Sequence, residues 1–167
     1  GYYNRIKLQI KFKDIKCISK NDCQAIVTHK NDNKFLLSGT NDVDCSNRGI
    51  IVTVHNVGKI EVPWRDFKSV CFESTNTGSG EPYRSFAKPK LLYGKVKTLD
   101  GKTERGVIVF DHDETWDYEH LEGLVNGIKY IVPFRNISAI SPKNISHSSI
   151  TLKNGKKLLL GELQDVS

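Results

Sequence analysis

The chain has 167 residues, 38% of them aliphatic, aromatic or cysteine, and it carries a formal net charge of +6 at pH 7. These hydrophobic residues and the 13 glycines place the composition in the range of globular domains, which excludes a fully disordered chain. No apolar run approaches the roughly 18 residues that a membrane-spanning helix needs, so no membrane span is expected.

The positive charge is spread along the chain. The basic residues are mostly lysines that stand singly between apolar residues, as Lys7, Lys11, Lys13 and Lys16 do. A bias toward Lys, Asn and Ile can arise from the base composition of a genome, so solvated strand faces are the favoured interpretation. A nucleic-acid or membrane-surface patch is the alternative, and it requires the charge to gather on one surface.

In chain order, the first predicted element covers residues 8–18 and consists of an alternating strand, a turn and a second strand. A hairpin follows over residues 25–39, with Asp32 and Asn33 at its tip, because both residue types tolerate turn conformations. The next hairpins are predicted over residues 92–110 and 149–161. Their tips are Asp100-Gly101 and Asn154-Gly155.

The strand, turn and strand element recurs twice. Residues 60–70 align without gaps on residues 130–140, and residues 8–18 form a third copy that lacks the proline. The identical positions of the two fuller copies are Val62, Pro63 and Arg65, matched by Val132, Pro133 and Arg135. A strand that stops at a turn and resumes after an apolar residue is typical of a small all-β unit, so the recurrence predicts an internal repeat.

This repeat predicts tandem five-stranded barrels with an incomplete unit at each terminus. The predicted segments are a closing half-unit at 1–20, a barrel unit at 21–73, a linker at 74–87, a second barrel unit at 88–142 and an opening half-unit at 143–167. Unpaired sheet edges at both ends favour association. We therefore expect the terminal half-units to combine, either within one chain or as a homodimer.

The order of these elements is similar to the five-stranded Sm-like and SH3-like barrels. The segment Tyr93 to Val96, with Asp100-Gly101 and Gly106 to Ile108, resembles an Sm-type opening hairpin. Over nearly its full length the chain also resembles an uncharacterised bacterial family with tandem copies of such units. The matching segments are 37–44, 47–50, 110–114, 121–123 and 132–137. The resemblance implies a barrel repeat and transfers no activity and no site.

The four cysteines, Cys17, Cys23, Cys45 and Cys71, form no CxxC pair, which argues against a zinc site. Buried thiols are the favoured interpretation. A disulfide in an exported protein is the alternative, and the sequence does not assign its partners. Because the chain holds no methionine and opens at Gly1, we expect the natural N-terminus to lie upstream. A periplasmic or extracellular location is favoured over a cytoplasmic one.

The candidates for chemistry are acidic and follow the second strand of each unit. They are Asp42, Asp44 and Asn47 in the first unit, and Asp111, Asp113, Glu114 and Asp117 in the second. Oxygen ligands at alternate positions suit Ca²⁺, which takes about 6 to 8 of them, so Ca²⁺ is the one cofactor considered. However, Trp116 occupies the place of the glycine in an EF-hand loop, and Asp and Asn also end strands by bonding their own backbone. A turn is therefore favoured over a metal site.

The sequence predicts no catalytic residue, because it holds neither a GxSxG elbow nor a local Cys and His signature, and a non-enzyme is expected. Trp64 aligns with Phe12 and Phe134 and is predicted to be core, whereas Trp116 is the candidate exposed aromatic for binding a ligand. The favoured function is a non-enzymatic interaction or structural module that binds a protein or an envelope component. The alternative is an Sm-like nucleic-acid-binding protein, and a metal-binding β-repeat protein is third.

Overall fold

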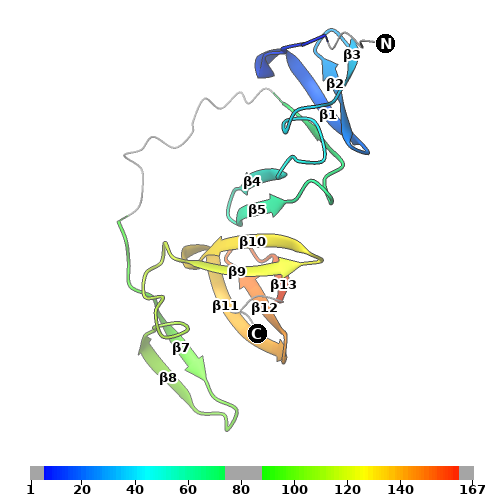
Figure 1. Cartoon of the computed structure of the whole chain (residues 1–167). Helices are drawn as coiled ribbons and strands as arrows, with labels where there is room; N and C mark the ends of the chain where they lie inside the picture. The colour runs from blue at the N-terminus through cyan, green and yellow to red at the C-terminus, as the bar shows by residue number, and fades with distance from the viewer. Residues whose placement is uncertain (1–5, 74–87, 162–167) are drawn as a thin grey trace. The chain divides into compact units, whose positions relative to one another are not determined.

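The computed structural model describes residues 6–73 and 88–161 (Figure 1). Their regular elements are antiparallel β-strands and short 3-10 turns, which confirms the predicted all-β class. No helix in these two stretches is long and apolar enough to cross a membrane. The predicted linker at 74–87 lies outside the described residues. The chain divides into two compact units, of which unit 1 takes residues 1–49 and 63–80 and unit 2 takes residues 50–62 and 81–167.

Unit 1 contains a four-stranded sheet in the order β3-β2-β1-β6. Its elements are the 3-10 turn η1 (Phe12–Asp14) and the strands β1 (Ile15–Asn21), β2 (Gln24–His29), β3 (Lys34–Leu37) and β6 (Ser69–Cys71). The strands alternate, so that Ile15, Ala25 and Val27 are buried on one face. Trp64 and Phe67 complete this core, with their rings stacked at a centroid distance of 5.0 Å. The burial of Trp64 confirms its predicted place in the core.

Two disulfides connect unit 1, so the favoured interpretation of four free thiols is wrong. Cys17 and Cys71 are direct partners on β1 and β6, with their Cα atoms 4.1 Å apart. Cys23, in the turn between β1 and β2, is joined to Cys45 in the loop that follows β3. Strand pairing thus brings together cysteines that are 54 and 22 residues apart in the sequence.

Unit 2 contains a seven-stranded sheet in the order β11-β12-β13-β9-β10-β5-β4. Its elements are β4 (Ile50–Val54), β5 (Gly58–Val62), β9 (His120–Val125), β10 (Ile128–Pro133), the 3-10 turn η3 (Phe134–Asn136), β11 (Ile137–Asn144), β12 (His147–Leu152) and β13 (Lys157–Gly161). The buried cluster is contributed by several of these strands and includes Leu121, Val132, Ile150 and Leu160. Burial of these apolar side chains is the main force that holds the unit together.

The remaining strands, β7 (Tyr93–Lys97) and β8 (Thr103–Val107), form a separate two-stranded sheet (Figure 1). Their pairing confirms the predicted hairpin at residues 92–110, and Gly101 at its tip has φ of +87°. A two-stranded hairpin buries little on its own, and most of its side chains are exposed.

The three copies of the strand, turn and strand element have similar local structures. In each copy a backbone N–H just after the turn donates to a carbonyl three residues earlier, as from Ile15 to Phe12, Phe67 to Trp64 and Ile137 to Phe134. The aromatic side chain differs, because Trp64 and Phe134 are buried while Phe12 is 71% exposed and meets the edge of Phe72. An internal repeat stays a prediction, and the shared turn is consistent with it.

No sheet within residues 6–73 and 88–161 closes into a barrel. The β4–β5 hairpin pairs with β10 through Glu61 and Lys129, and so it extends the sheet of unit 2. The boundaries of the two structural units are set by contacts such as these, whereas the boundaries of the predicted segments 21–73 and 88–142 were set by the sequence repeat. Those boundaries and the tandem barrels stay predictions.

Candidate binding site

The acidic loop of unit 2 is held together by hydrogen bonds to its own backbone. Asp111 and His112 adopt positive φ values of 46° and 69°, which turn the chain so that Phe110 and Glu114 form an isolated bridge. Asp117 accepts a hydrogen bond from the Lys90 backbone N–H at 3.0 Å, and its carboxylate lies 3.6 Å from Arg135. Asp117 therefore fixes the loop to two other segments of unit 2.

Glu119 is a loop residue that the sequence reasoning missed. Its Oε2 accepts backbone hydrogen bonds from Thr115 at 2.6 Å and from Trp116 at 2.7 Å. No helix begins here, so the capping spacing that would mark such a glutamate at a helix N-terminus did not apply, and the sequence held no signal for it. A shallow depression of about 400 Å³ joins Glu119 to Asp113 and Glu114, but Asp111 and Asp117 do not line it.

The acidic loop of unit 1 is likewise built on side-chain to backbone bonds. Asp44 Oδ1 accepts hydrogen bonds from the hydroxyl and the backbone N–H of Ser46, and these bonds lower the pKa of Asp44 below its ordinary value of 3.8. Asn47 donates to the carbonyl of Asp42 and accepts from the backbone N–H of Gly49 at 2.7 Å. These are turn interactions of the kind that Asp and Asn make when they end a strand.

Nowhere in the described part of the chain do three or more His, Cys, Asp or Glu side chains lie in a group that could hold a metal ion. The predicted Ca²⁺ ligands of both loops are within that part. The hydrogen bonds of Asp44 and Asn47 are those of a turn, and a Ca²⁺ role stays a prediction.

Trp116 is 38% exposed and stacks on Tyr118, with ring centroids 6.5 Å apart and planes 15° from parallel. The two rings form an aromatic surface beside the acidic loop. A role of Trp116 in binding a ligand stays a prediction.

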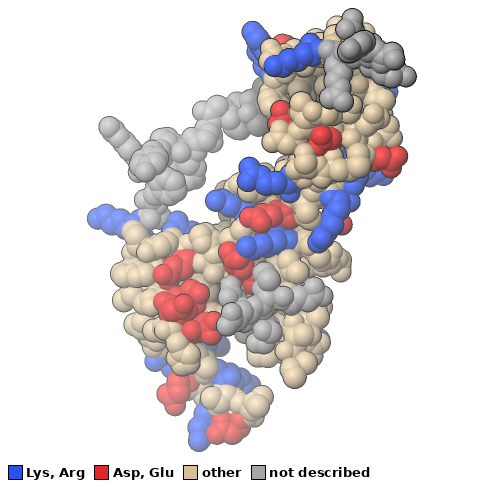
Figure 2. All heavy atoms as spheres, viewed as in Figure 1, with Lys and Arg blue, Asp and Glu red and all other residues tan. Residues whose placement is uncertain are grey.

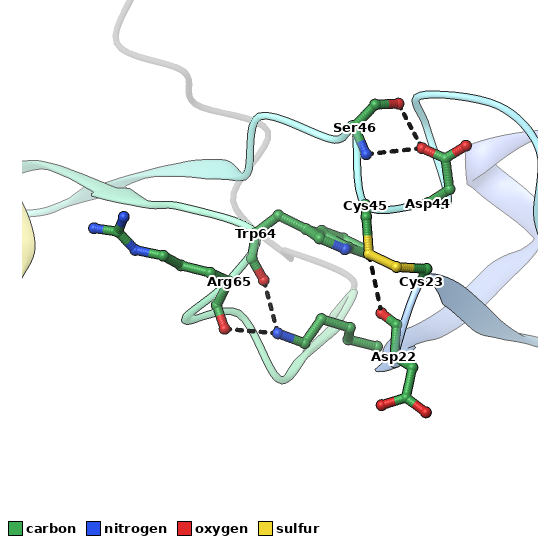
Figure 3. The surroundings of a disulfide bond; sticks show 8 residues. Asp22, Cys23, Asp44, Cys45, Ser46, Trp64 and Arg65 are labelled. Carbon is green, nitrogen blue, oxygen red and sulfur yellow. Dashed lines mark hydrogen bonds between the residues drawn. A yellow bond between two sulfur atoms is a disulfide. The ribbon is translucent and has the colours of Figure 1, made fainter.

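Unit 1 has a cavity of about 410 Å³ beside the Cys23–Cys45 disulfide, and Figure 3 shows the surrounding side chains. Its lining includes three cationic residues, Lys20, Arg48 and Arg65, and one carboxylate, Asp22. The Lys20 ammonium donates to the backbone carbonyls of Trp64 at 2.9 Å and Arg65 at 2.6 Å, which fixes the turn after β5 against β1. We call this feature the disulfide cavity.

Trp64 forms the apolar part of the disulfide cavity. Its side chain is 94% buried, and Figure 3 shows the indole alongside the sulfur atoms. Its Nε1 is buried and has no hydrogen-bond partner. A buried N–H without a partner costs free energy, which makes this an unusual feature of a folded protein. The sequence reasoning missed the cavity, because its residues come from three distant segments that strand pairing and a disulfide bring together.

The β7–β8 hairpin carries the second candidate surface. Alternation along the strands places Lys95, Lys97 and Arg105 on one face of the hairpin, together with Tyr93 and Val107. On the side of the molecule drawn in Figure 2, acidic and basic groups are interspersed over short distances, on this hairpin as elsewhere, and they do not form one broad patch. Within the hairpin, alternation separates the basic residues of this face from Glu104, which lies on the opposite face.

No family model matches the chain, and no curated protein and no solved structure matches it. The resemblance to a tandem-barrel bacterial family therefore stays a prediction.

Proposed function

We propose that the chain is a non-enzymatic binding module of the cell envelope or extracellular space, and that unit 1 binds an acidic segment of a partner at the disulfide cavity. The observation that carries the proposal is a cavity lined by a buried tryptophan and by the basic residues Lys20, Arg48 and Arg65, beside a disulfide that holds one of its loops. Disulfides persist in oxidising compartments and are rare in the cytosol, which supports an exported protein.

The disulfide cavity has the properties of a preformed site. Cys45 anchors the loop that carries Arg48, and Lys20 holds the turn that carries Arg65, so little ordering is left for the moment of binding. Arg48 and Arg65 are exposed residues, and arginine binds carboxylates in a bidentate manner. Arg65 already lies 3.3 Å from the Asp66 carboxylate through its Nε, so its terminal nitrogens and the guanidinium of Arg48 are the donors for a ligand. An acidic peptide is the ligand that this chemistry favours.

Fluorescence of Trp64 tests the proposal, with a Trp116→Phe background that leaves Trp64 as the single tryptophan. We expect poly-L-glutamate to cause a saturable change in emission, because the indole lines the cavity. Arg48→Gln with Arg65→Gln should weaken the response at least tenfold. Lys30→Gln with Lys34→Gln removes the same charge from exposed residues of unit 1 outside the cavity and should change it little. An equal loss in both variants, or no response at all, would contradict the proposal.

We also propose that β9 to β13 represent one five-stranded Sm-like or SH3-like unit of a tandem array. These strands are neighbours in the order β11-β12-β13-β9-β10, so β11 and β10 are the two outer strands of the run. The short turn η3 connects these two outer strands directly, and the five strands share one core, as expected for a small barrel. An experimental structure in which β10 and β11 had separate cores would contradict it.

The alternative function is an Sm-like nucleic-acid-binding protein, which the net charge of +6 supports. Salt-sensitive binding of a fluorescent single-stranded oligonucleotide tests it.

A further inference from the structure

Leu99, at the tip of the β7–β8 hairpin, is the most exposed large apolar side chain of the described residues, with a relative exposure of 110%. An apolar residue at this position therefore gains nothing from burial within the described chain. Lys97 precedes it and Lys102 follows it, and Lys95 and Arg105 stand farther along the two strands. The hairpin therefore combines an apolar tip with positive charge on both strands behind it.

Lys95 and Arg105 are direct cross-strand partners. Like charges in this position destabilise a strand pair. Among the residues that the structure describes, neither forms an ion pair, because the nearest acidic residue in the strands, Glu104, points to the opposite face by alternation. A negatively charged partner on this face would remove the repulsion.

We propose that the β7–β8 hairpin docks tip-first onto an anionic lipid surface, with Leu99 inserted at the boundary of the acyl chains. Strands rise about 3.3 Å per residue, so the Lys97 and Lys95 backbones would stand roughly 7 and 13 Å behind Leu99. The headgroup layer is roughly 5 to 7 Å deep, so these side chains and Arg105 would reach lipid phosphates.

Two observations favour lipid over nucleic acid as the partner of this face. A nucleic-acid backbone would use the cations but would leave Leu99 in water, whereas a lipid surface takes up both. The second is the pair of disulfides in unit 1, which place the chain in a compartment bounded by membranes if the proposed export holds. In that respect the inference rests on the proposed function.

Asp100 is the one negative group at the tip. Hydrogen bonds from the Thr98 hydroxyl and from Lys102 lower the pKa of its carboxyl below the ordinary value. Its carboxylate also lies 3.0 Å from the Lys102 ammonium, and so it neutralises part of the positive charge of the tip. Asp100→Asn keeps the oxygen that supports the turn and should therefore strengthen binding to anionic lipid.

Co-sedimentation with vesicles tests the inference. We expect the full chain to bind vesicles of equal phosphatidylglycerol and phosphatidylcholine at low salt, and not vesicles of phosphatidylcholine alone. Leu99→Ser should lower the partition coefficient about tenfold, and Lys97→Gln with Arg105→Gln also by at least tenfold. Asp100→Asn should raise it about fivefold. These exposed positions should leave the melting temperature unchanged.

Two matched controls keep the test specific. Ile145→Ser removes a second apolar residue, 95% exposed, from the β11–β12 turn, and Lys153→Gln with Lys156→Gln removes two exposed lysines from the β12–β13 turn. Both should bind like the original chain. An equal loss in Ile145→Ser, or the absence of binding to anionic vesicles, would overturn the inference.

A fluorescent single-stranded oligonucleotide provides the competing outcome. Salt-sensitive binding that Lys97→Gln with Arg105→Gln abolishes and Leu99→Ser leaves unchanged, without vesicle binding, would assign this face to nucleic acid and overturn the lipid inference. Failure here is distinguishable from failure of the proposed function, because the Trp64 assay reports on unit 1 and the vesicle assay on the hairpin of unit 2.

Discussion

Gly58 of β5 lies close against the backbone of β10 in unit 2. Its φ is +143°, and a Cβ atom built on it would lie 2.2 Å from the carbonyl oxygen of Ile131. The obstacle is main chain, so a side chain at this position must push the two strands apart. By contrast Gly155, with φ of +85° at the tip of the β12–β13 hairpin, has no atom within 4 Å of the same position.

We therefore expect Gly58→Ala to lower the free energy of unfolding by about 3 kcal/mol, and Gly155→Ala by about 1 kcal/mol from backbone strain alone. Urea unfolding followed by circular dichroism measures both. Equal effects of the two substitutions would contradict the close approach of the β10 backbone to Gly58.

The acidic loops lead to a prediction about Ca²⁺. Because Asp44, Asn47 and Asp117 already accept backbone hydrogen bonds, we expect millimolar Ca²⁺ to leave the melting temperature unchanged. An increase in melting temperature that is lost in Asp111→Ala with Asp113→Ala would contradict this expectation and restore the metal interpretation.

At the scale of elements, the local sequence was sufficient to predict a hairpin wherever residues that favour a turn stand between two alternating strands. The hairpins expected at residues 25–39, 92–110 and 149–161 are confirmed as β2–β3, β7–β8 and β12–β13. Their tips include Asp32, Gly101 and Gly155, each with a positive φ that Asp or Gly adopts at low cost. Alternation then determined which residues of each strand face the core.

Pairing between distant elements could not be predicted in the same way. Nothing in residues 50–62 distinguishes β10 as the partner of β5, because any strand edge with matching alternation offers the same hydrogen bonds. The disulfide pairing and the disulfide cavity depend on such distant pairings, and so they were missed. The turn roles of Asp44 and Asn47 were anticipated, because their hydrogen bonds are to residues two positions along the chain, whereas the contacts of Asp117 with Lys90 and Arg135 are between distant segments.

At the scale of the whole molecule, the chain passes from unit 1 into unit 2 at residue 50, returns at residue 63 and leaves again after the second segment of unit 1. Unit 1 is therefore built from two segments, which the Cys17–Cys71 disulfide joins covalently. Both disulfides lie within unit 1, and no cysteine lies in unit 2.

This division predicts that cysteine substitution affects the two units differently. Cys17→Ser with Cys71→Ser removes a cross-link over 54 residues and should cost unit 1 about 4 kcal/mol. Hydrogen exchange should accelerate at Ala25 and Val27 of unit 1 and stay slow at Leu121 and Ile150 of unit 2. Equal acceleration in both units would show that they unfold together.

The two cross-links are nested, because Cys23 and Cys45 both lie between Cys17 and Cys71 in the sequence. During synthesis from the N-terminus, the inner pair can close once residue 45 has emerged, while Cys17 must wait for 26 more residues to be made. Until then Cys17 is the thiol without its native partner, and once Cys23 and Cys45 are joined its thiolate can attack that disulfide and displace one of the two as a thiolate. Cys71 can pair with Cys17 only after β6 has been made, so the interval open to this exchange is set by the position of β6 in the sequence.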